Sequence, residues 1–300
     1  MANLKWEGIF PAVLTPFDED DNIDFAMFAK NTEAQISAGV HGIIIAGSLG
    51  EASALSREEK FLLLEKTLEI VNGRVPVLLN LTENTTKDAV AFAQKAEQLG
   101  ADGLMVLPPM RYKADDREVV TFFKTIAQSS SLPILVYNNP VDYATYITLD
   151  MMEEMLEEPT IQAVKESTRD LSNVTRLKNR FGDRLKILGG VDTICLESLL
   201  IGADGIVAGL VDAFPKETMA LYNWVQKGEY NKAIQLYRWF MPLLELDIHP
   251  KLIQYIKLAA TYEGLSTPYT RAPRLPLIGE EKERIEKLIE DAIAIRPQLD

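Results

Sequence analysis

The sequence predicts an α/β fold, a closed (β/α)8 TIM barrel followed by a C-terminal helical appendage. Eight short apolar runs rich in β-branched residues alternate with longer amphipathic stretches along the 300 residues, and barrels of this kind take roughly 250 residues as one domain. One helix-to-strand turn also repeats, at Ala38–Gly42, Leu99–Gly103 and Ile201–Gly205. An open doubly wound sheet typically has fewer strands, and no GxGxxG signature of a dinucleotide fold follows a strand here.

The eight strand-like runs are apolar throughout, which is typical of parallel strands that are buried on both faces. In chain order they are Gly8–Phe17, Gly42–Gly47, Pro76–Thr82, Gly103–Pro109, Pro133–Asn139, Ile161–Thr168, Leu185–Asp192 and Asp204–Val211.

Helical patterns fill the intervals, and several carry clear start and stop signals. Ser56–Glu59 is a capping box, and glycines such as Gly100 close helices. Residues 1–228 are expected to form the barrel, and residues 229–300 to form helices packed on it, because no low-complexity linker separates them. The helices expected are Ser56–Gly73, Thr86–Gly100, Asp115–Ser130, Leu171–Gly182, Pro215–Gly228, Glu229–Asp247, Lys251–Gly264 and Glu280–Ile295.

Composition narrows the class of function. The net charge of −13 argues against a surface for nucleic acid or anionic membrane, which needs a basic face. No apolar run approaches the roughly 20 residues that span a bilayer, and the N-terminal residues do not read as a secretion signal. A single cysteine, Cys195, and only two histidines, His41 and His249, argue against a disulfide framework and a His-rich metal site. We expect a cytoplasmic enzyme that acts on a small molecule without metal or cofactor.

Lys165 is the sharpest candidate for a catalytic residue. Active sites of such barrels lie at the C-terminal ends of the strands, and Lys165 follows the apolar run Ile161–Val164 in the sixth strand. Desolvation lowers the pKa of a lysine, and the neutral amine is the nucleophile that attacks a carbonyl. The alternative is a lysine that reaches solvent or pairs with Glu166, and the residues alone leave both interpretations open.

Other strand ends offer weaker candidates. The backbone N–H groups of the Gly47–Glu51 loop, with the Ser48 hydroxyl, could cradle a carboxylate, or the loop could be a plain glycine turn. Tyr137 could relay protons, or it could be a core aromatic residue. Arg111 and Tyr112 could reach the pocket, or they could be ordinary surface residues.

Taken together, these motifs resemble the dihydrodipicolinate synthase/N-acetylneuraminate lyase family. The likeness covers nearly the whole chain and implies a class I aldolase-type barrel, usually a homotetramer, with Lys165 as the Schiff-base lysine. The motifs that carry it are Gly8–Phe17, Gly47–Glu51, Tyr137–Pro140, Lys165–Thr168 and Gly189–Asp192.

The resemblance also implies roles for further residues. Tyr137 falls on the family's proton-relay tyrosine, and Ser48 on the hydroxyl residue that links this tyrosine to the substrate carboxylate. The backbone of Ser48 and Leu49 would bind that carboxylate. The carbonyl near Val207 would face the pocket, and Gly190 of the seventh-strand motif is expected beside the substrate.

Two departures from the dihydrodipicolinate synthases bear on the substrate. Where those enzymes have a second tyrosine after the fourth strand, the nearest match is Arg111. Where they place an arginine just after the fifth-strand proline, this chain has Val141–Tyr143, and Asp142 has the wrong sign to hold a second carboxylate.

Finer similarities favour one branch of the family. Pro108–Asp115, Tyr137–Pro140 and Pro250–Lys257 look similar to deaminases of 1-pyrroline-4-hydroxy-2-carboxylate, which form 2,5-dioxopentanoate. The alternatives are a 4-hydroxy-tetrahydrodipicolinate synthase or an aldolase or dehydratase of 2-keto-3-deoxy sugar acids. A non-catalytic barrel that binds a metabolite is the alternative from another class, and its signature would be loss of Lys165 or Tyr137.

Overall fold

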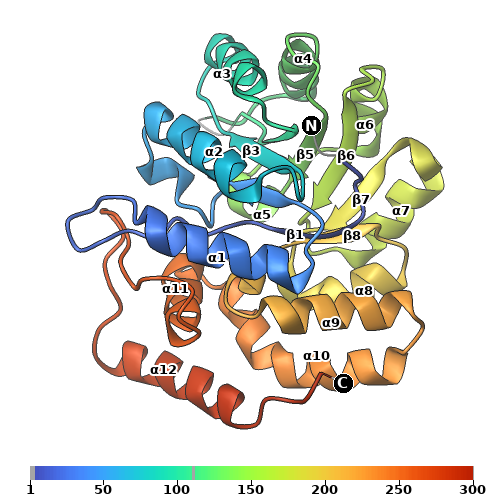
Figure 1. Ribbon diagram of the computed structural model, residues 1–300. Coiled ribbons are helices and arrows are strands. Elements are labelled where there is room, and N and C mark those ends of the chain that lie inside the picture. The colour runs from blue at the N-terminus through green and yellow to red at the C-terminus, as the bar shows by residue number, and fades with distance from the viewer. Residues whose placement is uncertain (1–3, 110–111, 300) are drawn as a thin grey trace.

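The computed structural model describes residues 4–109 and 112–299, which form a barrel of parallel strands ringed by helices (Figure 1). One eight-stranded sheet runs in the order β1-β8-β7-β6-β5-β4-β3-β2, so the (β/α)8 fold that the sequence predicts is confirmed. The strands are β1 (Gly8–Pro11), β2 (Ile43–Ile45), β3 (Val77–Leu81), β4 (Gly103–Val106), β5 (Ile134–Asn138), β6 (Ile161–Glu166), β7 (Lys186–Gly189) and β8 (Gly205–Ala208).

The ring closes between β1 and β2 through a short set of backbone contacts. An isolated parallel bridge joins Ala12 to Ile44, and the Val13 N–H donates to the Ile44 carbonyl at 2.9 Å. The His41 N–H donates to the Ile9 carbonyl, also at 2.9 Å. Because the ring is closed, all eight strands present their C-terminal ends at one rim.

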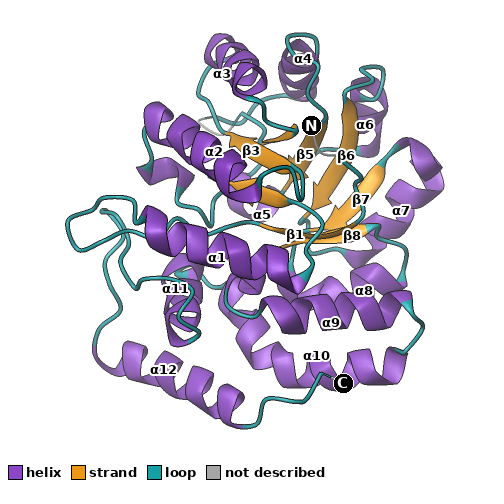
Figure 2. Cartoon of the chain, in the orientation of Figure 1, coloured by secondary structure: helices purple, strands orange, loops and turns teal. Residues whose placement is uncertain are grey.

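Helices cover the outside of the ring (Figure 2). The capping box at Ser56 is present, since Ser56 Oγ accepts from the Glu59 N–H at 3.1 Å and the Ser56 N–H donates back to Glu59 Oε2 at 2.8 Å. The barrel helices are α1 (Phe25–Ala38), α2 (Arg57–Val71), α3 (Thr86–Leu99), α4 (Asp116–Ala127), α5 (Pro140–Tyr143), α6 (Leu149–Met155), α7 (Leu171–Phe181), α8 (Cys195–Leu200) and α9 (Pro215–Gln226).

The C-terminal helices α10 (Tyr230–Leu244), α11 (Leu252–Tyr262) and α12 (Gly279–Ala294) lie together against one side of the barrel (Figure 1). Helix α10 packs on both α9 and α12. The boundary between barrel and appendage at residue 228 stays a prediction. None of the described helices is long and apolar enough to cross a membrane.

Most of the strands and several helices end earlier than the sequence pattern indicates, and two of these differences bear on the site. The first strand stops at Pro11, because the apolar residues that follow are buried in a loop, where the Leu14 N–H donates to Asp212 Oδ1 at 3.1 Å. The helix expected over Glu229–Asp247 ends at Leu244. It continues as a 3-10 turn, η5 (Glu245–Ile248). This turn places Asp247 near the barrel rim.

Gly205 sits where β8 approaches β1 most closely. A Cβ added there would overlap the carbonyl oxygen of Gly8 and lie 2.6 Å from the Gly8 nitrogen. Gly205→Ala should therefore lower the free energy of unfolding by about 1–3 kcal/mol, as overpacking of a well-packed core does. Denaturant unfolding measures the change. Gly47→Ala is the matched control, since its nearest neighbour would be Met105 Cε at 3.5 Å; equal stability of the two variants would contradict this strand contact.

Candidate active site

A pocket opens at the C-terminal rim of the barrel, and Lys165 lies in it. The structure brings Ser48, Leu49, Tyr137, Lys165, Gly190 and Val207 together in this pocket, whereas Arg111 lies outside the described residues. The full lining is Ala12, Ser48, Leu49, Met105, Tyr137, Asn139, Asp142, Lys165, Ser167, Arg169, Gly190, Val191, Val207, Gly209, Asp247, Ile248 and Leu252.

The Lys165 side chain is buried at 7% exposure, and its Nζ lies 4.2 Å from the centroid of the Tyr137 ring. Successive residues of a strand point to opposite faces, so the neighbouring Glu166 turns away from the pocket. Its carboxylate accepts from the Thr168 N–H and from Asn173 Nδ2, both at 2.8 Å. Lys165 is therefore neither a surface lysine nor the ion-pair partner of Glu166.

Burial lowers the pKa of Lys165, and nearby carboxylates act in the opposite direction. Asp247 has the largest of these opposing effects, and Asp192 and Asp142 add to it. The Asp192 carboxylate accepts from the N–H groups of Gly209, at 3.2 Å, and Leu210, at 2.7 Å. Desolvation outweighs the acids for Lys165, which favours the neutral amine that a nucleophile requires.

Gly190 provides the space that the Lys165 side chain occupies. A Cβ at Gly190 would overlap Ser167 Oγ and lie 2.7 Å from both Cγ and Cε of Lys165. Ser167 Oγ donates to the Gly190 carbonyl at 3.0 Å. Gly190 thus acts on the geometry of the lysine, in addition to lining the pocket as the sequence motif predicts.

Tyr137 lies on β5 beside Lys165, and its side chain is buried. The Tyr137 hydroxyl accepts from Asn139 Nδ2 at 3.1 Å. Burial raises the pKa of Tyr137 well above its usual range. The hydroxyl therefore stays protonated at neutral pH and is available to donate a proton.

Tyr143, on α5, is a pocket neighbour that the sequence pattern did not indicate. Its hydroxyl contacts Ser48 Oγ, and its ring packs edge-on against Tyr137 with centroids 5.6 Å apart. Burial raises the pKa of Tyr143 to about 12. Ser48 thus meets the hydroxyl of Tyr143 in this structure, whereas the resemblance implies a link from Ser48 to Tyr137. The one sequence signal that Tyr143 lies near the pocket was its position three residues after Pro140.

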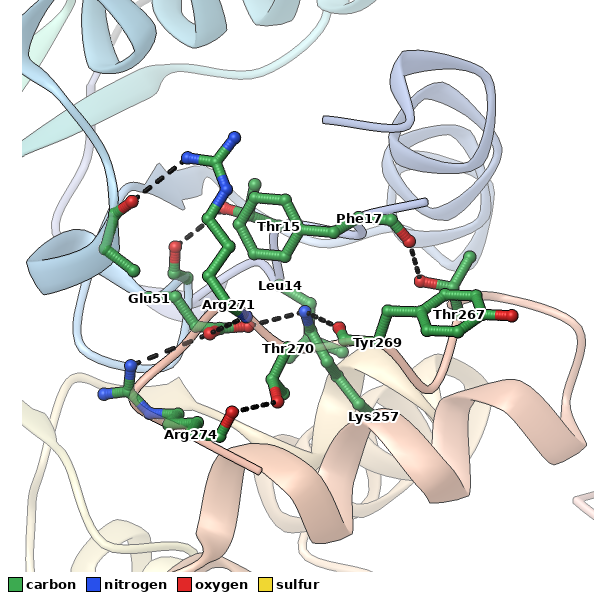
Figure 3. Close-up of polar contacts among 12 residues, drawn as sticks. Leu14, Thr15, Phe17, Glu51, Lys257, Thr267, Tyr269, Thr270, Arg271 and Arg274 are labelled. Atoms are coloured by element: carbon green, nitrogen blue, oxygen red, sulfur yellow. Dashed lines mark hydrogen bonds and ion pairs between the residues drawn. The ribbon is translucent and has the colours of Figure 1, made fainter. Parts of the chain in front are cut away.

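A buried ion pair between Glu51 and Lys257, which we call the brace, supports the Gly47–Glu51 loop (Figure 3). Glu51 and Lys257 are both fully buried, with Lys257 Nζ 2.5 Å from Glu51 Oε1. The ammonium also donates to the Tyr269 carbonyl at 2.6 Å, and Glu51 Oε2 accepts from the Arg271 N–H at 3.3 Å. The C-terminal part of the chain therefore holds the loop that the sequence assigns to the substrate carboxylate.

The histidines and the cysteine have structural surroundings. The Nδ1 atom of His41 accepts from the Ile9 N–H, and that of His249 from the Lys251 N–H, each at 3.1 Å. Cys195 is buried, which raises the pKa of its thiol. Within the described residues, no group of three or more His, Cys, Asp or Glu side chains is arranged to hold a metal ion.

Removing the Lys257 amine should leave the Glu51 charge buried with only the Arg274 guanidinium among the described side chains, at 3.6 Å, as an ion-pair partner to offset it. We expect Lys257→Met to lower the free energy of unfolding by about 3–5 kcal/mol, and the double variant Glu51→Gln/Lys257→Met to recover much of the loss. Denaturant unfolding measures both. Lys66→Met is the control, because the Lys66–Glu69 pair is exposed and contributes little. A double variant no more stable than the single one would show that the pair is not the brace described.

The chain is similar to known proteins along nearly its whole length. The model of the dihydrodipicolinate synthetase family matches residues 5–292. The chain is similar to the 4-hydroxy-tetrahydrodipicolinate synthases of Methanospirillum hungatei, at 29% identity over 95% of this chain and 98% of the relative, and of Thermodesulfovibrio yellowstonii, at 30% over 97% and 100%.

Solved structures agree with these relatives. The 4-hydroxy-tetrahydrodipicolinate synthase of Methylacidiphilum fumariolicum superposes with a TM-score of 0.91 at 29% identity, covering 96% of this chain and 97% of that one. The chloride-inhibited dihydrodipicolinate synthase of Acinetobacter baumannii, solved in complex with pyruvate, gives 0.91 at 26% identity over 97% and 100%.

Proposed function

Because this chain belongs to the dihydrodipicolinate synthetase family of lyases, we propose that it acts through a Schiff base on Lys165. The observation that carries the proposal is the buried Lys165 amine in the pocket, 4.2 Å from the Tyr137 ring centroid. Both residues whose loss would mark a non-catalytic barrel are present, and both line this pocket.

The first steps use groups that the pocket supplies. The neutral amine of Lys165 attacks the carbon next to a substrate carboxylate, and the resulting iminium serves as an electron sink. The protonated Tyr137 hydroxyl moves the protons that this addition requires. The carboxylate is assigned to the backbone of Ser48 and Leu49, in the loop that Glu51 and Lys257 brace.

The charges of the pocket favour a substrate with one carboxylate. Asp142 lines the pocket from the segment after the fifth-strand proline, where the dihydrodipicolinate synthases that the sequence resembles place an arginine. Asn139 Nδ2 donates to its carboxylate at 2.7 Å. Asp192 adds a further acid near Lys165. Aspartate semialdehyde would bring a second carboxylate toward this acidic side, whereas 1-pyrroline-4-hydroxy-2-carboxylate carries only one.

The hydroxypyrroline also suits the chemistry of a lysine amine. Its C2 is already an imine carbon, so Lys165 can add there and release the ring nitrogen as a primary amine on C5. Loss of a proton from C3 gives an enamine, which expels the C4 hydroxyl group as water. Movement of a proton from C5 to C3 gives an enamine between C4 and C5, and transfer of a proton from its nitrogen to C4 makes C5 an imine. Hydrolysis at C5 and at C2 consumes two waters and yields ammonia and 2,5-dioxopentanoate, a net uptake of one water.

The second candidate is 4-hydroxy-tetrahydrodipicolinate synthesis, and the relatives, which are named as synthases for this reaction, favour it over the deaminase. The position of Arg169 supports this synthase reaction, because Arg169 is the one cation besides Lys165 among the described residues that line the pocket. The relatives in Methanospirillum hungatei and Bacillus velezensis are 29% and 28% identical to this chain, a distance that supports the family more than one reaction within it.

The homotetramer that the resemblance implies is part of the proposal, and sedimentation analysis of the purified protein tests it. A similar structure at 23% identity and a TM-score of 0.89 belongs to a monomeric dihydrodipicolinate synthase variant, so the fold alone leaves the oligomeric state open. The cytoplasmic location expected from the sequence likewise stays a prediction.

Covalent trapping tests the Schiff base. Borohydride added in the presence of pyruvate should attach one ligand per chain, and peptide mapping should place it on Lys165, since this lysine combines burial with a position in the pocket. Lys165→Ala should abolish both the label and turnover. Lys60→Met is the control for a buried amine outside the pocket, since it should retain the label. A label on a different lysine would contradict the mechanism.

The substrate is tested by comparing two reactions on one purified sample. We expect ammonia release from 1-pyrroline-4-hydroxy-2-carboxylate to be efficient and the condensation of pyruvate with aspartate semialdehyde to be poor, because Asp142 repels the second carboxylate. Arg169→Gln separates the candidates further, since it should weaken condensation only if Arg169 holds that carboxylate. Efficient condensation without ammonia release would establish the synthase and reject the deaminase, with the Lys165 mechanism intact.

A further inference from the structure

We infer that Asp247 is the general acid that protonates the hydroxyl group leaving C4 of the substrate. The inference rests on the proposed hydroxypyrroline reaction, and it assigns a catalytic role to the C-terminal appendage.

Asp247 reaches the catalytic pocket from outside the barrel strands. It lies in the 3-10 turn η5, between α10 and α11, and its half-buried side chain lines the same pocket as Lys165. Gly209, which directly follows β8, leaves room for it: a Cβ at Gly209 would lie 2.6 Å from Asp247 Oδ1. A carboxyl group therefore lies at the barrel mouth, at a point from which a side chain on residue 209 would displace it.

The surroundings of Asp247 favour its protonated form. Burial and the charge of Asp192 raise the pKa of Asp247 to about 8, against the opposing charge of Lys165. Asp192 accepts hydrogen bonds from the Gly209 and Leu210 N–H groups, which stabilise its anion. Burial raises the pKa of Asp192 as well, but two backbone N–H groups stabilise its carboxylate, so Asp247 binds the proton more readily of these two neighbouring acids. The negative charge of Asp142, from α5, also raises the pKa of Asp247.

The elimination step needs such a proton. In the enamine, the electron pair of the C2–C3 double bond forms the new C3–C4 double bond as the nitrogen lone pair restores the iminium. The C4–O bond breaks with its electrons on oxygen, which takes the proton of Asp247 and leaves as water. Asp247 is left as a carboxylate and regains a proton from solvent. Tyr137 lies beside Lys165, which places it at the C2 end of the substrate.

Asp247→Asn tests the assignment, with Glu245→Gln as the control because Glu245 is an exposed acid in the same turn. Deamination by Asp247→Asn should fall by about 10²–10⁴-fold, the usual contribution of a general acid. Borohydride trapping of pyruvate on Lys165 should persist. With the hydroxypyrroline, borohydride should now trap the ring-opened adduct before elimination, heavier by one water than the dehydrated adduct.

The pH profile gives a second measurement. A required acid with a pKa of about 8 makes turnover of the native enzyme fall as pH rises above that value, and this limb should vanish in the residual activity of Asp247→Asn. Native-like deamination by Asp247→Asn would overturn the assignment alone. Loss of pyruvate trapping in a folded Asp247→Asn variant would overturn it too, since Asp247 would then act on Lys165. Absence of deamination by the native enzyme would instead reject the proposed function.

Discussion

Closure of the eight strands into one ring is the constraint on which the site depends. A closed parallel barrel brings every strand's C-terminal end to a single rim, so residues more than a hundred positions apart meet there. The strict alternation within β6 then sends Lys165 into the barrel mouth and Glu166 outward to Asn173. A shift of one residue in the register of β6 would exchange an amine for a carboxylate in the pocket.

The pocket combines one buried amine with several acids inside a chain of net charge −13. Such a site suits a chemistry in which the lysine is a nucleophile and not an anchor for anions. Desolvation keeps the amine reactive, and the acids divide into Asp192, which is hydrogen-bonded as an anion, and Asp247, whose environment favours the proton. Two carboxyl groups with different surroundings can hold different protonation states at one pH.

The barrel and its lysine could be predicted from the sequence because each produces a local pattern of residue types. Eight apolar runs indicate buried parallel strands, and a lysine next to such a run is conspicuous. Asp247 and Tyr143 carry no comparable signal. Asp247 is the last residue of the helix expected over Glu229–Asp247, and only the turn η5 directs it to the pocket. Tyr143 meets Ser48 across 95 positions of chain, a contact that no local pattern encodes. The brace between Glu51 and Lys257 could not be predicted from the sequence for the same reason.

That brace has a consequence for how the protein is made. Lys257, Tyr269 and Arg271 all follow Glu51 by more than two hundred positions. Lys257 and Arg271 contact its carboxylate, and the Tyr269 carbonyl accepts from Lys257. During synthesis the N-terminal part of a chain emerges first, so Glu51 must wait for its partners until nearly the whole polypeptide has left the ribosome. The strands of the barrel can begin to pair while translation continues, but the loop assigned to the substrate carboxylate gains its support only at the end. A nascent chain that stops early would therefore hold much of a barrel without a finished active site.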